Sequence, residues 1–465
     1  MCCFSLALLW EVALFVSFLC LSIFQHSWPF IYIAGLPTSC WSDRPHLIAM
    51  YQSILNLLKN LTQGNYQQLA ADFEPEYFKL ISKSGGILSA ESLRSIHAAL
   101  EEGKVEDVVD EIQQSLNAAE NASLNVAVIG DSGSGKSSFI NALRGLSHQE
   151  EGSASVGVVE TTMRKTPYQH PKYPKVTFWD LPGNGSPNFH PDTYLETMGL
   201  AEYDFFIIIS SSRFSFNDAD LAQKINKMGK KFYFVRTKVD SDLYNEKRAK
   251  PKSFQREKVL QQIRDDCVTH LQNNGVPEPQ VFLVSNFDLG DFDLLKLEET
   301  LLKELPAHKR HVLALLMPSS SEDAIEMKKT FLREKIWLEA LKSAAVGLVP
   351  CMPFISGFGV AEQQACLKVY RSHFGVDNES IEKISQKLGV SVDHLKNLIK
   401  SSDFWHLVKD DSIEAQAMTY AELLCSVTGG PVSAVIQFFK VYFLHIKFLD
   451  TVADDAKRLF QMMKQ

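Results

Sequence analysis

The feature that most constrains this chain is a glycine-rich loop directly after a short apolar run. Residues 124–129 have the composition of a buried strand, and the next residues, Gly130–Ser137, fit the spacing GxxxxGK[ST]. Glycines in such a loop let backbone N–H groups surround a phosphate, and the following helix directs its positive end at the same point. The sequence therefore predicts a phosphate-binding loop between a strand and a helix.

Consecutive residues of this loop provide the predicted phosphate contacts. The Lys136 ammonium can reach the β- and γ-phosphates, and the Ser137 hydroxyl can ligate Mg²⁺. The residues expected to contact the nucleotide here are Gly130, Asp131, Ser132, Gly133, Ser134, Gly135, Lys136, Ser137 and Ser138. A chance glycine loop is the alternative, and the strand and helix patterns on its two sides disfavour it.

A second motif, Asp180-Leu181-Pro182-Gly183, ends a later strand-like segment and fits the pattern DxxG. Asp180 can hold Mg²⁺, usually through water, and the Gly183 N–H can contact the γ-phosphate. Between the two motifs, the segment 157–162 occupies the position of a first switch. A threonine there can complete the Mg²⁺ shell, and Thr162 is preferred over Thr161; an inert loop is the alternative.

A third motif, Thr237-Lys238-Val239-Asp240, resembles the guanine-reading pattern [NT]KxD. The Asp240 carboxylate can accept from guanine N1–H and the 2-amino group, a donor pair that adenine lacks. The stem of Lys238 can lie on the base, whereas Thr237 stands where Asn is usual. Ser285 and Asn286 follow another strand-like segment and are placed to support the base. The three motifs together predict binding of GTP or GDP and favour a GTPase over a phosphate-loop kinase.

One expected group is missing from this pattern. Many GTPases have a water-orienting Gln immediately after the DxxG glycine, and here that residue is Asn184. The sequence therefore predicts slow hydrolysis alone, or hydrolysis that needs a group from a second molecule. A nucleotide-gated scaffold or regulator that does not hydrolyse GTP stays open as the alternative.

The order of patterns along the chain predicts the fold class. Strand-like segments at 124–129, 175–179, 205–210, 231–236 and 281–284 alternate with helical segments, which is typical of an α/β fold with a mostly parallel sheet. After Leu305-Pro306 the chain has helical patterns to its end. The predicted parts are a hydrophobic extension (1–45), an N-terminal helical segment (46–120), a GTP-binding domain (121–305) and a C-terminal helical domain (306–465).

The first residues raise a separate question. From Phe4 to Phe24 the chain is almost wholly apolar, and no Lys or Arg precedes Arg44. A membrane anchor, a poorly cleaved signal and a spurious extension remain open. Two apolar stripes in the C-terminal part, which include Ile336 and Phe448, predict core packing, with a membrane-facing surface as the alternative.

The charge balance bears on possible partners. With 47 Lys and Arg against 55 Asp and Glu, the formal net charge is −8. General nucleic-acid binding usually requires a basic face, so we expect no nucleic-acid partner.

Beyond these motifs, the sequence resembles the immunity-related GTPases, the interferon-inducible p47-type family, from about residue 88 onwards. The stretches that carry the resemblance are Gly130–Gly145, Gly157–Met163, Phe178–Gly183, Glu202–Ser210, Phe232–Asp242 and Leu305–His311. Lys136 is typical of the members with Lys, rather than Met, in the phosphate loop. The resemblance implies a Ras-like GTPase domain flanked by a split all-α helical domain.

The resemblance also implies a working mode. Such proteins assemble with GTP, associate with related GTPases and act on intracellular membranes, including vacuoles that hold pathogens, in cell-autonomous immunity. A switch glutamate serves at the interface between two GTPase domains, and Glu160 is the matching position. We therefore expect a cytoplasmic and membrane-associated protein at the endoplasmic reticulum, the Golgi or a pathogen vacuole. The start Met1-Cys2-Cys3 lacks the Met-Gly myristoylation signal of many relatives.

Overall fold

The computed structural model describes residues 54, 56–81, 85–155, 164–182, 198–199, 202–211, 216–348, 360–402 and 430–463. Contacts within the chain divide it into two compact units. Among the described residues, the sheet unit comprises residue 85 and those between 119 and 324. The helical unit comprises those up to 81, from 86 to 118 and from 325 onwards. The four domain ranges stay predictions, because a unit of dense contacts need not fold or act alone.

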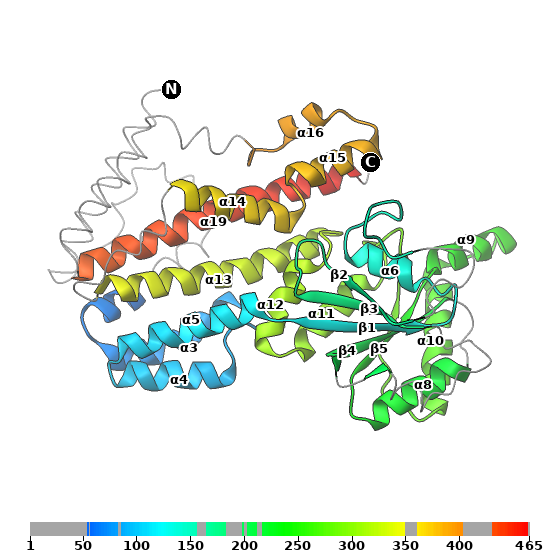
Figure 1. Cartoon of the computed structure of the whole chain (residues 1–465), viewed down its shortest axis with the longest axis horizontal. Helices are drawn as coiled ribbons and strands as arrows, with labels where there is room; N and C mark the ends of the chain where they lie inside the picture. Colours follow the sequence, from blue (N-terminus) through cyan, green and yellow to red (C-terminus); the bar gives the residue numbers. More distant parts are fainter. Residues whose placement is uncertain are drawn as a thin grey trace. The chain divides into compact units, whose positions relative to one another are not determined.

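A single mixed sheet organises the sheet unit. Within the described residues it has six strands in the order β2-β3-β1-β4-β5-β6 (Figure 1). The strands are β1 (Leu124–Gly130), β2 (Thr166–Gln169), β3 (Val176–Asp180), β4 (Phe205–Ser210), β5 (Phe232–Arg236) and β6 (Val281–Leu283). All neighbours pair in parallel except β2, which runs antiparallel to β3. The predicted α/β class with a mostly parallel sheet is confirmed, and β2 is an edge strand that the sequence did not predict.

Helices cover both faces of this sheet, as parallel strands require. The helices that lie wholly within the sheet unit are α6 (Lys136–Leu143), α8 (Phe216–Lys227), α9 (Val239–Ala249), α10 (Arg256–Asn273), α11 (Leu294–Glu304) and α12 (Ala307–Leu316). On one face, Ile129, Phe206 and Phe234 pack against Leu221 of α8 and Leu271 of α10. On the other face, α6 and α12 contact β1. All residues of β4 are therefore buried, which explains its unbroken apolar sequence.

The helical unit is built from the two ends of the described chain. Its helices are α3 (Tyr66–Leu80), α4 (Ala90–Glu101), α5 (Val105–Asn121), α13 (Glu322–Leu348), α14 (Val360–Phe374), α15 (Asn378–Leu388), α16 (Val392–Leu398) and α19 (Gly430–Met463). Both α5 and α13 continue into the sheet unit at one end. Ser89 caps α4, because its side chain accepts a hydrogen bond from the Ser92 N–H at 3.0 Å.

A buried polar group lies where the chain enters α4. The Glu334 carboxylate accepts hydrogen bonds from the Tyr77 hydroxyl and the Ile87 N–H, both at 2.5 Å, and Tyr77 accepts one from the Leu88 N–H at 2.9 Å. A Cβ atom at Gly86 would stand 2.4 Å from the Tyr77 oxygen. Only glycine therefore leaves room for the carboxylate and the phenol to meet the backbone here.

The predicted apolar stripes are largely buried within the helical unit. Ile336 on α13 and Phe448 on α19 are both buried, as core packing predicts. Trp337 of α13 packs against Phe73 of α3, with ring centroids 5.6 Å apart. Among the described helices, we find none with the length and apolar character needed to cross a membrane. The apolar segment Phe4–Phe24 lies outside the described residues.

Candidate functional site

The predicted phosphate-binding loop lies between β1 and α6, at the carboxyl end of a central strand. Gly130 must be glycine, because a Cβ atom there would stand 2.0 Å from the backbone oxygen of Ile209 on β4. Gly135, directly before α6, has φ +94°, a conformation that L side chains rarely adopt. These glycines let β4 pass close to the loop and let the chain turn sharply into the helix.

The Lys136 side chain is folded back along this loop. Its Nζ donates to the carbonyl oxygens of Gly130 at 2.8 Å and Asp131 at 3.0 Å, and only 7% of the residue is exposed. Burial would be costly for an ammonium without partners, and the two carbonyl groups offset that cost. The loop thus holds a positive charge where the motif predicts phosphate.

Three successive carbonyl groups of the loop are held by the segments predicted to read guanine. The bonds are Lys238 Nζ to Gly133 O at 2.9 Å, Thr237 Oγ1 to Ser134 O at 2.6 Å, and Asn286 Nδ2 to Gly135 O at 3.1 Å. A trans peptide is planar, with its C=O and N–H pointing opposite ways. Fixing the Ser134 carbonyl towards Thr237 therefore points the Gly135 N–H to the other side of the loop.

Two buried polar atoms of this region have no hydrogen-bond partner in the part of the chain that the structure describes. They are Ser134 Oγ and Asn286 Oδ1. Buried polar atoms are nearly always paired in folded proteins, so an unpaired one commonly marks a place for water or a ligand. The site suited to a phosphorylated ligand consists of these two atoms, the three loop carbonyl groups held by side chains, and the buried Lys136 ammonium.

The predicted guanine-reading segment turns sharply from β5 into α9. Lys238 has φ +59°, and it is the one non-glycine residue with positive φ among those the structure describes. This turn places Asp240, the predicted guanine acceptor, half-buried in the first turn of α9. Burial raises the pKa of the neighbouring Asp242 carboxyl, and Arg236 partly offsets this effect across a 2.7 Å ion pair.

Arg236 was not among the predicted site residues. Its guanidinium also donates to the Thr237 carbonyl at 2.7 Å, so it holds the start of the guanine-reading segment. A charged residue at the end of an otherwise apolar strand was the available signal. The support of the base by Ser285 stays a prediction. Its hydroxyl accepts from the N–H groups of Phe287 at 3.3 Å and Asp288 at 3.2 Å.

The two described candidates for metal binding lie side by side. The Ser137 hydroxyl, at the start of α6, donates to Asp180 Oδ2 at 2.9 Å, and Asp180 is fully buried at the end of β3. Within the described residues, no group of three or more His, Cys, Asp or Glu side chains could hold a metal ion. The predicted Thr162, Glu160 and Gly183 lie outside the described residues.

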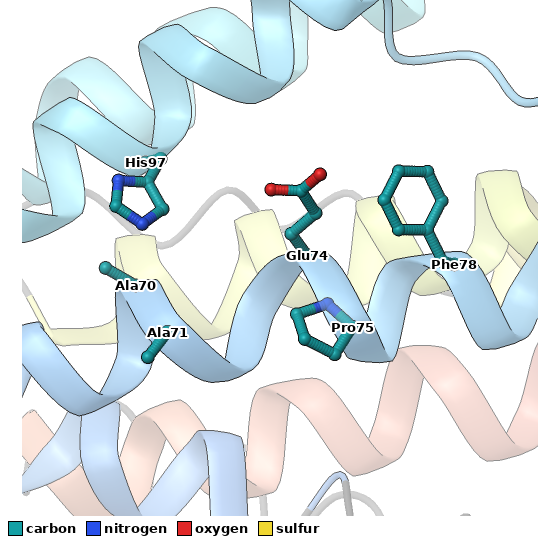
Figure 2. A pocket seen from close by; sticks show the side chains of 6 residues that line it. All are labelled: Ala70, Ala71, Glu74, Pro75, Phe78 and His97. Carbon is teal, nitrogen blue, oxygen red and sulfur yellow. The ribbon is translucent and has the colours of Figure 1, made fainter.

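A shallow pocket elsewhere involves none of the predicted site residues. It has a volume of about 280 Å³ and lies in the helical unit (Figure 2). Its lining residues are Ala70, Ala71, Glu74, Pro75 and Phe78 from α3 and His97 from α4. Pro75 has no N–H, so it cannot make the usual helical hydrogen bond to the Ala71 carbonyl one turn earlier.

Comparison with known proteins extends over most of the chain. The family model described as Interferon-inducible GTPase (IIGP) matches residues 89–463. Interferon-gamma-inducible GTPase 10 of Mus musculus is 47% identical over 386 residues, which cover 83% of this chain and 92% of that protein. T-cell-specific guanine nucleotide triphosphate-binding protein 2 of the same species is 47% identical, with coverage of 82% and 91%.

A more distant relative agrees with these two. Interferon-inducible GTPase 1 of Mus musculus is 41% identical over 385 residues, which cover 83% of this chain and 93% of that protein. The resemblance inferred from the sequence motifs is thereby confirmed, and with it GTP hydrolysis as the activity. This chain belongs to the interferon-inducible GTPase family.

Proposed function

We propose that this GTPase assembles with GTP, completes its hydrolytic site across an interface between two copies, and acts on intracellular membranes. The observation that most supports a working nucleotide site is the set of three loop carbonyl groups held by Thr237, Lys238 and Asn286. These bonds join the phosphate loop to the guanine-reading segments, so a single guanine nucleotide can contact both. In this proposal, the loop residues 130–138 and Gly183 bind phosphate, and Asp240 and Ser285 serve the base.

A magnesium ion fits the oxygen donors that are present. Ser137 Oγ and Asp180 Oδ2 are 2.9 Å apart at the loop, and hydroxyl and carboxylate oxygens are the hard ligands that Mg²⁺ prefers. We assign Ser137 and Asp180, together with Thr162, as the residues that would hold the ion, with Asp180 acting directly or through water. Bound there, Mg²⁺ would neutralise charge on the β- and γ-phosphates.

The proposed division of labour in hydrolysis follows from the chemistry of the side chains. Lys136 neutralises phosphate charge. Many GTPases have a Gln after DxxG, and Asn184 at this position has a shorter side chain, so its carboxamide does not reach as far. We assign Glu160 to the interface between two copies, where its carboxylate can act on the partner's site and offset the missing Gln. Hydrolysis should therefore accelerate as the copies associate.

The proposed setting is cell-autonomous innate immunity. Membership of the interferon-inducible family supports action in the interferon response. We propose a cytoplasmic protein that associates with the endoplasmic reticulum, the Golgi or a pathogen vacuole, with related GTPases as further partners. Nucleic acid is not a proposed partner, since the net charge is −8.

Turnover per molecule against protein concentration tests the assembly proposal. With the full chain at saturating GTP and Mg²⁺, we expect specific activity to rise with concentration. Lys136→Ala should abolish GTP-dependent assembly, and Glu160→Gln should remove the rise while GDP affinity is retained. Asp240→Asn should weaken guanine binding specifically. Turnover that stays flat with concentration would refute a shared site, and tight binding without turnover would favour a nucleotide-gated scaffold.

Vesicle sedimentation tests the membrane proposal separately. Vesicles of phosphatidylcholine with phosphatidylserine are mixed with the full chain and either GDP or a non-hydrolysable GTP analogue. The GTP analogue should increase the sedimented fraction, and Lys136→Ala should prevent that increase. Equal sedimentation with both nucleotides and in Lys136→Ala would contradict nucleotide-controlled membrane binding.

A further inference from the structure

The most exposed large apolar side chain in the described part of the chain lies next to the predicted base-supporting residues. It belongs to Phe287, which is 78% exposed. A single exposed phenylalanine is ordinary on a protein surface, so exposure alone indicates nothing. The position in the chain is informative, because Phe287 directly follows Ser285 and Asn286, the pair predicted to support guanine.

The backbone of Phe287 is fixed at the end of the sheet. β6 pairs in parallel with β5, so the segments that follow these two strands, 284–287 and 237–240, begin side by side. Ser285 is fully buried, and its hydroxyl accepts from the Phe287 N–H at 3.3 Å and the Asp288 N–H at 3.2 Å. This local turn fixes the backbone of the segment, while the phenyl ring stays exposed.

The residue before Phe287 ties this segment to the phosphate loop. Asn286 Nδ2 donates to the Gly135 carbonyl at 3.1 Å. A Cβ atom at Gly135 would stand 3.1 Å from that nitrogen and 3.6 Å from Thr237 Oγ1. The phosphate loop, the guanine-reading segment and the base-supporting pair therefore meet at Gly135, and Phe287 is the next residue along the chain from that meeting point.

A second aromatic ring contacts Phe287. His148 lies in the chain that follows α6, and the centroids of the two rings are 6.2 Å apart with an interplanar angle of 89°. Edge-to-face rings attract each other, because the edge of one is positive and the face of the other is negative. His148 Nδ1 lies 3.3 Å from Nδ2 of Asn141, a fully buried residue of α6. The imidazole thus orients the phenyl ring and leaves most of its surface open.

A guanine base has two flat faces as well as an edge. The Asp240 carboxylate is assigned to the edge. The Lys238 ammonium donates to the Gly133 carbonyl at 2.9 Å, so its apolar stem is held beside the phosphate loop and can cover one face. The other face needs a flat apolar surface. An aromatic ring suits it, since every base has a π-face that stacks on aromatic side chains.

We infer that the Phe287 ring packs on the guanine base, on the face away from Lys238, with His148 orienting the ring. This contact takes the exposed phenyl surface out of water when nucleotide binds, and it adds affinity without reading the edge of the base. The inference deepens the proposed function and rests on its assignment of Asp240 and Ser285 to the base.

The test makes the same change at two exposed phenylalanines. Phe287→Ala removes the proposed contact. Phe78→Ala is the matched control, because Phe78 is 50% exposed and lies on α3 in the helical unit. Binding of unlabelled GDP to the full chain is measured by isothermal titration calorimetry, since a fluorescent group on the ribose could itself contact the ring. Single-turnover hydrolysis at saturating GTP is measured at one protein concentration.

We expect Phe287→Ala to weaken GDP binding by about 5- to 150-fold, which corresponds to about 1–3 kcal/mol for one base–aromatic contact. Hydrolysis at saturating GTP should stay within about threefold of the parent protein, because the ring contacts the base and not the phosphates. Phe78→Ala should bind GDP as the parent does. Unchanged GDP affinity in Phe287→Ala, or an equal loss in Phe78→Ala, would overturn the inference.

Two further variants distinguish stacking from apolar bulk. Phe287→Tyr keeps the aromatic face and should bind GDP within about twofold of the parent protein. Phe287→Leu keeps an apolar side chain but has no π-face, so it should lose most of the affinity that Phe287→Ala loses. Leucine that binds GDP as tightly as phenylalanine would show that the ring does not stack.

A second nucleotide tests which part of the base the ring contacts. Inosine diphosphate lacks only the 2-amino group at the edge of guanine. A contact with the flat face does not sense that group, so Phe287→Ala should weaken GDP and inosine diphosphate by the same factor. A loss confined to GDP would mean that the substitution acts through Asp240, and the proposed contact would be wrong.

Asp240→Asn separates this inference from the proposed function. If it binds GDP as tightly as the parent protein, the assignment of Asp240 to guanine fails, whatever Phe287→Ala does. If it weakens GDP binding and Phe287→Ala does not, the guanine-reading assignment stands and the ring contact is wrong. If Phe287→Ala changes only GTP-dependent assembly, the ring packs against a second copy, and stacking on guanine is again wrong.

Discussion

Replacing Thr237 by Val tests whether the guanine-reading segment orients the phosphate loop. Thr237 is fully buried, and its hydroxyl donates to the Ser134 carbonyl at 2.6 Å and, over a longer distance of 3.3 Å, to the Ser210 carbonyl. Valine has nearly the same shape, so packing is kept and only the hydrogen bonds are lost. The Ser134 peptide is then free to turn, and the Gly135 N–H no longer points reliably at phosphate.

The size of the effect follows from the burial of the bond. Leaving a buried acceptor without its donor costs about 1–3 kcal/mol. If this energy orients the loop for its ligand, Thr237→Val should weaken GDP binding by about 5- to 150-fold. Titration with a fluorescent GDP analogue measures the affinity, and Thr237→Ser is the control because it retains the hydroxyl.

The two variants together show whether the Thr237 hydrogen bond orients the phosphate loop. Thr237→Ser should bind GDP nearly as well as the parent protein, although the lost methyl group lowers stability slightly. If Thr237→Val is folded and binds GDP within about twofold of the parent protein, a change of about 0.4 kcal/mol, the hydrogen bond does not orient the loop.

Three further predictions concern other parts of the structure. Gly130→Ala should abolish nucleotide binding and cost about 1–3 kcal/mol or more, because its Cβ would stand 2.0 Å from the backbone oxygen of Ile209; GDP titration and thermal unfolding measure this. Gly86→Ala should cost about 2–4 kcal/mol in denaturant unfolding, because its Cβ would stand 2.6 Å from the buried Glu334 carboxylate. Burial lowers the pKa of His445 from 6.5 to about 4, so the unfolded chain binds the proton more tightly. The folded state should then lose about 2 kcal/mol between pH 7 and pH 5, and His445→Gln should remove that loss from the pH profile of unfolding.

Matched glycine variants control for the loss of glycine itself. Gly145 lies in the sheet unit and Gly389 in the helical unit; both have positive φ, and neither has an atom within 4 Å of an added Cβ. Alanine at either position should cost only the backbone penalty of about 1–2 kcal/mol. Steric conflict is wrong as the cause if Gly130→Ala resembles Gly145→Ala, or if Gly86→Ala resembles Gly389→Ala.

The pH prediction has its own check. His445 Nδ1 lies 3.0 Å from the Tyr370 hydroxyl, and the Lys335 charge also disfavours protonation of the imidazole. Glutamine can keep a hydrogen bond to Tyr370 without titrating between pH 7 and pH 5. Parallel pH profiles for the parent protein and His445→Gln would show that this histidine does not control acid stability.

The parts of the fold that were predictable are those in which one residue pattern has one structural meaning. The apolar run of β4 requires burial on both faces, and the glycines of the phosphate loop require positive φ or close approach. The edge strand β2 could not be predicted, because its four residues include Pro167 and alternate only between half-buried and exposed. Pairing with β3, rather than local sequence, makes it a strand.

In the candidate site, too, some features could be predicted from the sequence and others could not. Motif spacing was sufficient to predict that Lys136, Ser137 and Asp180 lie together, because chain order fixes which strand ends meet at one edge of a parallel sheet. Their roles stay predictions. It could not predict that Thr237 and Asn286 bond the loop carbonyl groups, since those contacts depend on side-chain conformation. Glu160 and Thr162 lie outside the described residues and stay predictions.

The interleaving of the two units has a consequence for synthesis on the ribosome. Between residue 118 and residue 325, the chain belongs to the sheet unit, so the helical unit must wait for this whole stretch. At roughly 5–20 residues per second the delay is about 10–40 s. During it, Phe73 and Tyr77 have no Trp337 to pack against. The sheet unit can fold first, while α3, α4 and α5 present apolar faces that chaperones can bind until α13 and α19 emerge.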